Sequence, residues 1–241
     1  MQDAVVIIPT YNEIENIESI IRAVFALPKA FDVLVVDDNS PDNTAQKVKD
    51  LQIEFPDRLS LEVRQKKSGL GTAYIHGFRW ALKKKYQFIF EMDADFSHNP
   101  KDLIHLYDAC YYGKADVAIG SRYVKGVNVV NWPLGRVILS YGASMYVRFV
   151  TGMKVRDATA GFICYKRQVL EQLDLNQIKF VGYAFQIEMK FKANLKKFKI
   201  VEVPVIFTDR TKGESKLSSS IISEAIFGVV SMKLKSLFKS N

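Results

Sequence analysis

Ala4-Val5-Val6-Ile7-Ile8-Pro9-Thr10-Tyr11-Asn12-Glu13 is an apolar run that passes directly into a polar segment. Five consecutive apolar residues of this kind predict a β-strand that is buried on both faces, as in a parallel sheet. Asn12 can cap a helix, and the apolar residues that follow it recur every three to four positions. The first 25 residues therefore predict a strand, a polar turn and an amphipathic helix.

The same order of apolar run, polar turn and helical pattern recurs along the first half of the chain. A second buried strand is predicted at residues 33–36, and further strands are predicted at residues 59–63, 88–92 and 117–120. Helices are predicted at residues 44–55, 72–84 and 100–110. The first of these helices is preceded by Ser40 as N-cap and by Pro41 at the first helical position. This alternation predicts an α/β fold with a mostly parallel sheet and helices on both of its faces.

The second half of the chain is less regular. Strands are predicted at residues 162–165 and 200–207, and Pro204 indicates that the latter lies at an edge of the sheet. A helix is predicted at residues 184–195, and apolar or amphipathic segments lie at residues 133–150 and 221–238. A chain of 241 residues is long enough for one large α/β domain, so we expect a single domain over residues 1–241.

The composition is that of a basic globular protein. Lys and Arg number 34 against 26 Asp and Glu, which gives a net charge of +8 and favours polyanionic partners such as nucleotides or an anionic membrane face. No run of about 18 uncharged apolar residues predicts a transmembrane helix. The apolar run near the N-terminus is too short for a signal peptide, so we expect a cytoplasmic protein. No nucleic-acid-binding motif is present, and we expect no nucleic-acid partner.

Carboxylates follow three of the predicted strands. They are Glu13, Asp37, Asp38, Asp93 and Asp95. Because the carboxyl ends of parallel strands meet at one edge of a sheet, where ligands bind, we expect these side chains to converge. Five carboxylates at one edge repel each other unless cations or hydrogen-bond donors neutralise them. A divalent cation that prefers oxygen ligands, Mg²⁺ or Mn²⁺, explains the cluster most simply, with Asp93 and Asp95 as its ligands.

Cationic side chains lie in or near the predicted loops as counterparts to these carboxylates. They are Lys67, Arg122, Arg136, Arg156, Arg210 and Lys216. Guanidinium groups match phosphate oxygens in pairs, whereas Lys acts as a point charge. Residues 210–216 are predicted to form a polar loop with a glycine between the last predicted strand and the last predicted helix. This loop can close over a diphosphate.

Several motifs together resemble a known enzyme family. PTYNE at 9–13, DDNSPDNT at 37–44, GLGTA at 69–73, MDADFSHNP at 92–100 and GSRY at 120–123 resemble the inverting family 2 glycosyltransferases, which have the Rossmann-like GT-A fold. DATAGF at 157–162, GYAFQIEM at 182–189, EVP at 202–204 and DRTKGESKL at 209–217 are similar to the dolichol-phosphate, or polyprenol-phosphate, mannose synthases. The resemblance extends from about residue 4 to residue 217, and its last two motifs are the most specific.

The resemblance implies a set of site residues. Those implied to bind the nucleotide sugar are Pro9, Tyr11, Glu13, Val36, Asp38, Asp93, Ala94, Asp95, Arg122, Lys179, Arg210 and Lys216. Arg122 and Arg136 would bind the acceptor phosphate, and Asp95, Arg210 and Lys216 would be catalytic. The family often carries Gln as a further metal ligand where this chain has Ser97. Residues 1–125 would then form the donor half of the domain, and residues 126–241 the acceptor half.

The implied reaction moves mannose from GDP-mannose to a dolichyl or polyprenyl monophosphate, with Mg²⁺ or Mn²⁺ as cofactor. A lipid acceptor requires contact with a membrane surface, so residues 133–150 and 221–238 are candidate interfacial helices on its cytoplasmic face. The resemblance also allows a separate membrane-anchoring partner. Two alternatives stay open: a UDP-sugar donor (glucose or N-acetylhexosamine) with a polyprenyl phosphate or saccharide acceptor, and a nucleotide-binding module without catalysis.

Overall fold

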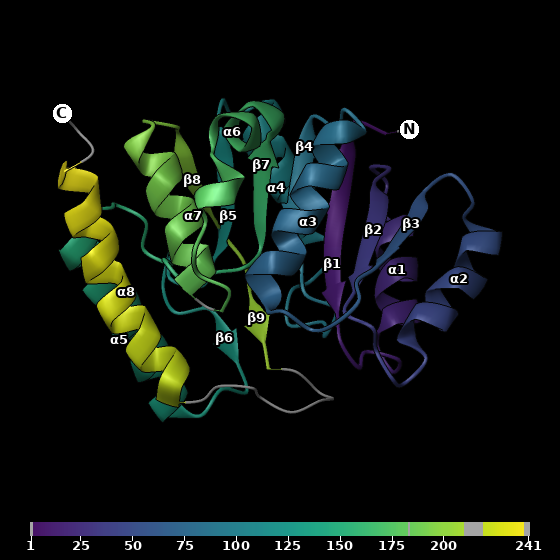
Figure 1. The fold of residues 1–241 in the computed structure, drawn as a ribbon, viewed down its shortest axis with the longest axis horizontal. Helices are drawn as coiled ribbons and strands as arrows, with labels where there is room; N and C mark the ends of the chain where they lie inside the picture. The colour runs from purple at the N-terminus through teal and green to yellow at the C-terminus, as the bar shows by residue number, and fades with distance from the viewer. Residues whose placement is uncertain (1, 183, 210–218, 239–241) are drawn as a thin grey trace.

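The computed structural model describes residues 2–182, 184–209 and 219–238, and its centre is a seven-stranded sheet (Figure 1). The strand order is β3-β2-β1-β4-β7-β5-β8. The strands are β1 (Ala4–Thr10), β2 (Asp32–Asp37), β3 (Leu59–Val63), β4 (Phe88–Glu91), β5 (Val117–Ser121), β7 (Ile163–Lys166) and β8 (Ile200–Pro204). Every neighbouring pair is parallel except those of β7, which runs antiparallel to β4 and β5. The predicted mostly parallel sheet is therefore confirmed.

Helices cover both faces of this sheet (Figure 1). One face carries α1 (Ile17–Phe25), α2 (Thr44–Glu54) and α4 (Asp102–Tyr111), and the other carries α3 (Leu70–Lys83), α6 (Arg167–Gln172) and α7 (Ala184–Leu195). A short 3₁₀ helix, η1 (Leu175–Gln177), precedes α7. Along β1, Ala4, Val6 and Ile8 enter the first core, whereas Val5 and Ile7 enter the second. This alternation explains why residues 4–8 of the strand are all apolar.

The two predicted helix caps are wrong. Helix α1 begins at Ile17 and α2 begins at Thr44, several residues after Asn12 and Ser40. Instead, the Asn12 N–H donates to the Ser40 hydroxyl at 3.0 Å, and that hydroxyl donates to Asp37 at 2.6 Å. These polar residues join the turns that follow β1 and β2 to each other, so they fix the carboxyl edge of the sheet rather than the helices.

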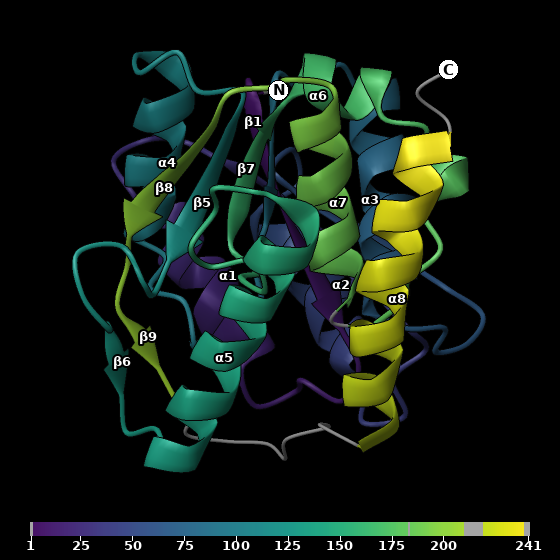
Figure 2. The same cartoon turned by 90° about the vertical axis from the view of Figure 1, so that its left-hand side faces the viewer.

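The strand predicted at residues 200–207 is interrupted after Pro204. Pro204 ends β8 at the edge of the sheet, as predicted, because its missing N–H cannot extend a ladder. The chain then leaves the sheet, and β9 (Phe207–Thr208) pairs in parallel with β6 (Val129–Val130). This small second sheet lies below β5 and β8 in Figure 2.

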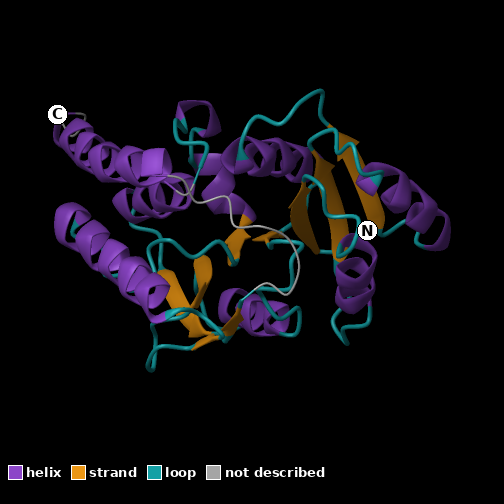
Figure 3. Ribbon diagram, turned by 90° about the horizontal axis from the view of Figure 1, so that it is seen from below, coloured by secondary structure: helices purple, strands orange, loops and turns teal. Residues whose placement is uncertain are grey.

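Helices α5 (Leu134–Thr151) and α8 (Ser219–Phe238) contact each other at one end of the molecule (Figures 1 and 3). A third apolar cluster connects them to α7 through Val147, Ile187 and Val229. Both helices also leave large apolar side chains in solvent, and Phe149 is 91% exposed and Phe227 76%. Among the described residues, no helix is both long and apolar enough to span a bilayer.

Candidate active site

A cavity of about 600 Å³ opens at the carboxyl edge of the sheet, which Figure 3 views from below. Its polar end contains Asp93, Asp95 and Arg122. Its other walls are largely apolar and come mainly from α5, which contributes Ile138, Leu139, Gly142, Ala143, Tyr146 and Val147. The cavity can therefore hold a molecule with a charged group at one end and an apolar chain at the other.

The turn after β4 presents Asp93 and Asp95 to this cavity. The Asp93 carboxylate accepts a hydrogen bond from the Tyr74 hydroxyl at 3.3 Å, and the Ser97 N–H donates to Asp95 Oδ1 at 3.0 Å. Phe96, which lies between Asp95 and Ser97 in the sequence, has a φ of +57°. This left-handed conformation costs a bulky residue about 1–3 kcal/mol. Strained backbone conformations of this kind cluster at functional sites, so this strain is consistent with a functional turn.

Asp93 and Asp95 fit a divalent cation as a pair of carboxylate ligands. Ser97 lines the same cavity, and its hydroxyl is buried without a hydrogen-bond partner. A buried hydroxyl of this kind is a hard oxygen that a cation or its water can use. The described residues contain no cluster of three or more His, Cys, Asp or Glu side chains arranged for a metal. The Ser97 hydroxyl, water and substrate oxygens are available as further ligands to a cation held by this pair.

The other strand-end carboxylates are neutralised by hydrogen-bond donors. Asp37 accepts from the Thr10 hydroxyl at 2.8 Å and from Ser40, and it is completely buried. Glu13 accepts from the Asn16 amide at 3.0 Å, while its own N–H donates to Thr44. Of the five predicted carboxylates, Asp93 and Asp95 line the large cavity and these do not.

Asp38 has a partner that the sequence interpretation did not identify. Arg64, just after β3, donates to both Asp38 oxygens at 2.5 and 2.7 Å and to the Thr72 hydroxyl at 2.8 Å. Both charged side chains are largely buried. Because Arg64 holds Asp38 by both oxygens and also reaches α3, it fixes this carboxylate beside the Lys66–Lys67 loop. The signal available in the sequence was a cation directly after a predicted strand.

The remaining residues of the predicted base pocket lie around the end of β1. Pro9 pairs in register with Val36, which is fully buried in the core that faces α3. Tyr11 is half-buried, and the Lys67 ammonium lies 4.1 Å from the centre of its ring. This cation–π contact brings together the turn after β1 and the basic loop before α3.

Arg122 is part of a buried ion pair. Its N–H, Nε and Nη2 donate to Asp157 at 2.9, 2.7 and 2.6 Å, and Asp157 has no exposed surface. Nη2 also donates to Thr159 at 2.8 Å. The guanidinium lies 5.4 Å from the Trp132 ring and 5.5 Å from the Phe207 ring. Arg122 still lines the cavity, so its positive charge is held rigidly at the polar end.

The other predicted phosphate-binding residues are distributed differently. Arg136 lines the cavity, stacks over Trp132 at 4.1 Å and donates to Asp209 at 2.7 Å. The Lys179 side chain is exposed and lines neither this cavity nor the one described next. Ala94 is buried behind Asp93 and Asp95. Arg210 and Lys216 lie outside the described residues.

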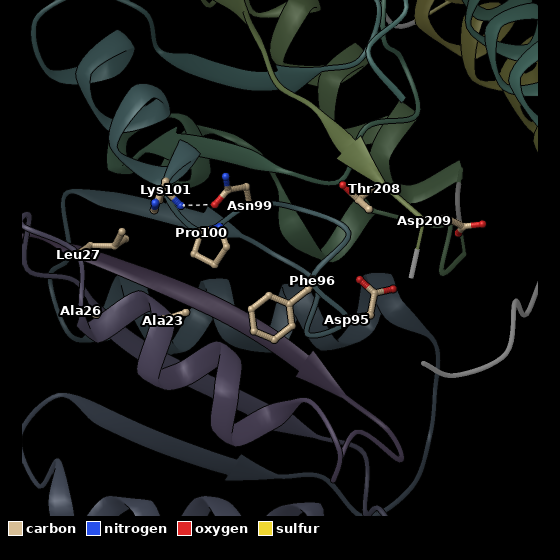
Figure 4. Close-up of a pocket in the computed structure, with 10 residues that line it drawn as sticks. All are labelled: Ala23, Ala26, Leu27, Asp95, Phe96, Asn99, Pro100, Lys101, Thr208 and Asp209. Carbon is tan, nitrogen blue, oxygen red and sulfur yellow. Dashed lines mark hydrogen bonds between the residues drawn. The ribbon is translucent and has the colours of Figure 1, made fainter. Parts of the chain in front are cut away.

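A second cavity, of about 560 Å³, lies between α1 and the turn that follows β4 (Figure 4). Asp95 lines both cavities, and Figure 4 shows Asp95 and Phe96 projecting in different directions from one turn. Ala23, Ala26, Leu27 and Pro100 make much of its surface apolar. Asp95 therefore borders a cavity on each of two sides.

His98 is a cavity residue that the sequence interpretation missed. Its ring stacks on Phe162 at 4.8 Å and meets Phe207 edge-on at 5.2 Å. Burial lowers the pKa of His98 to about 4, so the imidazole is neutral at pH 7. The position of His98 three residues after Asp95 was a signal in the sequence that it lies near the site. Its packing between Phe162 and Phe207 was not predictable, because the position of Phe207 depends on the pairing of β6 with β9.

Comparison with known proteins identifies the family of this chain. A family model described as Glycosyl transferase family 2 matches residues 5–174. The chain belongs to glycosyl transferase family 2. The family 2 assignment confirms that this protein is a glycosyltransferase, as its motifs predicted.

Two relatives are similar in sequence to this family 2 chain over most of its length. A polyprenol monophosphomannose synthase of Mycolicibacterium smegmatis is 47% identical over 228 residues, which are 95% of this chain and 86% of the relative. A dolichol-phosphate mannosyltransferase of Pyrococcus furiosus is 39% identical over 91% of this chain and 60% of its own length.

Solved structures confirm the predicted GT-A fold of this family 2 chain. A mannosyltransferase from Pyrobaculum calidifontis in complex with GDP-Man and Mn²⁺ matches with a TM-score of 0.62 and 17% identity, covering 99% of this chain and 65% of that one. Glucosyl-3-phosphoglycerate synthase of Mycobacterium tuberculosis, in complex with Mn²⁺ and UDP, matches with a TM-score of 0.67 and 16% identity over 96% of this chain and 78% of that one.

Proposed function

We propose that this family 2 glycosyltransferase moves mannose from GDP-mannose to a polyprenyl or dolichyl monophosphate, with inversion at the anomeric carbon. The single observation that carries this proposal is the cavity that joins Asp93, Asp95 and Arg122 to the apolar wall of α5. A nucleotide-sugar diphosphate suits its polar end, and the first isoprene units of a lipid phosphate suit its apolar end. The names of the two relatives support mannose and a polyprenyl phosphate.

In this reaction an oxygen of the acceptor phosphate attacks the anomeric carbon and forms the new C–O bond. The bond between that carbon and the diphosphate breaks, and its electron pair leaves with GDP. A phosphate monoester has a second pKa of about 6, so the acceptor is largely ionised at pH 7 and needs no strong base. Asp157 is occupied by three donors of Arg122, which fits a role in orientation and not in proton removal.

Asp93 and Asp95 are the proposed ligands of Mg²⁺ or Mn²⁺, which when bound supplies positive charge beside the leaving diphosphate. Mn²⁺ in the two solved structures of this fold supports the choice of cation. Arg122 and Arg136, which both line the cavity, are proposed to bind the acceptor phosphate. The proposed catalytic roles of Arg210 and Lys216 are to stabilise the leaving group.

The remaining donor contacts are proposed around the end of β1, and the two halves of the domain divide the substrates between them. Pro9, Tyr11, Glu13, Val36, Asp38 and Lys179 are the proposed nucleotide-binding residues besides those at the Asp93 turn. Residues 1–125 would hold the donor and residues 126–241 the acceptor. Arg64 supports this division because it fixes Asp38 on the donor side.

The exposed apolar faces of α5 and α8 are the proposed contact with the cytoplasmic face of a membrane. Phe149→Glu should reduce the protein's recovery with anionic liposomes in a flotation assay, since Phe149 is 91% exposed on α5. Ile53→Glu is a matched control, because Ile53 is 84% exposed on α2, away from these helices. Equal recovery of both variants with wild type would contradict the proposed membrane face.

The test of function is a transfer assay with a short polyprenyl phosphate and Mg²⁺ or Mn²⁺. GDP-mannose, UDP-glucose and UDP-N-acetylhexosamine are offered in parallel, and lipid-linked product is detected by mass spectrometry. We expect product from GDP-mannose, and loss of at least 10²-fold in rate for Asp95→Asn with an unchanged melting temperature. Product only from a UDP-sugar would overturn the proposed donor, and the absence of product from all three donors would overturn the proposed acceptor.

A further inference from the structure

Helix α5 carries a glycine, Gly142, near the middle of its length. A glycine inside a helix lowers the stability of that helix relative to alanine, so it needs a reason in the packing or the backbone. Neither gives one here. Among the described residues, no atom lies within 4 Å of the place that a Cβ would take, and the φ of Gly142 is not positive. This glycine therefore leaves a space open instead of allowing a close contact.

The space that Gly142 leaves belongs to the large cavity, which Gly142 lines. Ile138 and Tyr146 lie four positions before and after it, and residues four positions apart lie on the same face of a helix. Both of them line the cavity as well. Two helical turns separate Ile138 from Tyr146, which is about 11 Å along the axis. Between these two large side chains the wall of the cavity has only a glycine, so it contains a notch.

This notch lies where the cavity opens to solvent. Ile138 is 64% exposed and Leu139 51%, and Gly142 is exposed beside them. In contrast, Val147 and Ile187 line the same cavity but are at most 2% exposed, so they close its inner end. A molecule that is longer than the cavity can therefore leave it across α5 at Gly142.

Helix α5 connects this notch to the proposed site of the acceptor phosphate. Arg136 and Ser140 lie one turn apart on α5, and both line the cavity. The Tyr123 hydroxyl donates to the Ser140 hydroxyl at 2.8 Å, which ties α5 to the residue that follows Arg122. Gly142 lies six residues beyond Arg136, which is about 9 Å along the helix axis. A phosphate near Arg136 can therefore carry a chain that reaches the notch.

The surroundings of the notch suit an apolar chain. Ile138, Leu139 and Ala143 line the cavity around Gly142. The hydroxyls of a saccharide would lose their hydrogen bonds to water against such a wall, whereas an isoprenoid chain gains from leaving water. The exposed side chains of α5 also include Phe149, on the proposed membrane face. A chain that is anchored in a bilayer has to leave the protein on that side.

We infer that the lipid chain of the acceptor leaves the cavity across α5 at Gly142, and that the missing side chain at this position keeps the path of the chain open. Gly142 is thus a specificity-determining residue for a phosphate with a long apolar chain. The inference rests on the proposed function, because it needs a lipid phosphate as acceptor.

The test fills the notch with Gly142→Leu and measures binding by calorimetry. Leucine favours a helix over glycine, so the variant should melt at or above the temperature of wild type. Its affinity for farnesyl phosphate, a short isoprenoid monophosphate, should fall about tenfold or more, because the added side chain occupies the path of the chain. Its affinities for GDP-mannose and for methyl phosphate, which has no isoprenoid chain, should stay within about twofold of wild type.

Gly135→Leu is the matched control. Gly135 is exposed in the first turn of α5, does not line the cavity, and has no described atom within 4 Å of its Cβ position. It adds the same apolar side chain to the same helix and should bind farnesyl phosphate as wild type does. Gly142→Ala, which adds one methyl group, should show a smaller loss than Gly142→Leu. Should the latter fail to fold, Gly142→Met places a flexible side chain in the same path.

Three results would overturn the inference. The first is an unchanged affinity of Gly142→Leu for farnesyl phosphate. The second is an equal loss with methyl phosphate, which would place the effect at the phosphate and not along the chain. The third is an equal loss in Gly135→Leu, which would trace it to added apolar surface. If wild type bound no isoprenoid phosphate and glycosylated another acceptor, the proposed function would be refuted and the inference with it. Binding by wild type and by Gly142→Leu alike would refute the inference alone.

Discussion

Replacing Asp157 with Ala should be among the most destabilising single changes at the site. Asp157 is fully buried and accepts three hydrogen bonds from Arg122, whose side chain is only 9% exposed. Removing one partner of a buried ion pair costs about 3–5 kcal/mol, because the other charge remains in the interior without compensation. For a chain of this size, 1 kcal/mol shifts the melting temperature by about 2–4 °C. Asp157→Ala should therefore melt roughly 6–20 °C below wild type.

Thermal unfolding followed by circular dichroism, without ligands, measures this shift. Asp108→Ala is the matched control, since Asp108 is exposed on α4 and its loss should change the stability by less than about 0.5 kcal/mol. The double variant Arg122→Ala/Asp157→Ala should cost less than the sum of the single variants by about 1 kcal/mol or more, as expected for coupled residues. A melting temperature for Asp157→Ala within 2 °C of wild type, or strict additivity, would refute the assignment of a buried ion pair.

Three further outcomes follow from contacts described above. Arg64→Met should weaken GDP binding about tenfold in calorimetry, because it releases both oxygens of Asp38; unchanged affinity would remove Asp38 from the nucleotide site. The folded-state pKa of His98 lies near 4, below its unfolded value, so the unfolded state binds more protons as the pH falls from 6.5 to 4 and stability drops by up to about 3 kcal/mol. His98→Gln should flatten that part of the stability profile in urea titrations, whereas His76→Gln, an exposed control, should not. Gly71→Ala should lower the free energy of unfolding by about 1–3 kcal/mol, since its Cβ would meet an aromatic ring of α7 at 2.7 Å; a neutral effect would show that α7 can move away.

The sequence was sufficient for elements with a clear periodic pattern. Strand β3 and helix α7 have the predicted bounds, because β3 alternates apolar and polar residues and α7 carries a full helical period. The turn at Asp93 and Asp95 was likewise predictable, since it directly follows a buried strand. Contacts between turns were not predictable: the hydrogen bond from Asn12 to Ser40 connects residues 28 positions apart, and it replaced two caps that local propensity favoured.

Side chains whose roles depend on partners from other elements were harder to predict than the carboxylates that directly follow the strands. Arg64 and His98 acquire their roles from partners on other elements, and no spacing in the sequence connects Arg64 with Asp38, 26 positions away. The antiparallel direction of β7 also has no local signal, because a short apolar run has the same pattern in either direction. Pairing across a sheet is a property of the assembled fold, and pattern alone does not specify it.

The late strand β7 has a consequence for the way this chain must be synthesised. Strands β4 and β5 do not pair with each other; residues 163–166 fill the space between them, and β8 covers the far side of β5. A nascent chain that has emerged only as far as α5 thus has an unpaired edge on β4 and no partner at all for β5. Open strand edges recruit other chains. A chain that ends before residue 163 would be aggregation-prone, and truncation at that point should yield insoluble protein although residues 1–125, the proposed donor half, are all present.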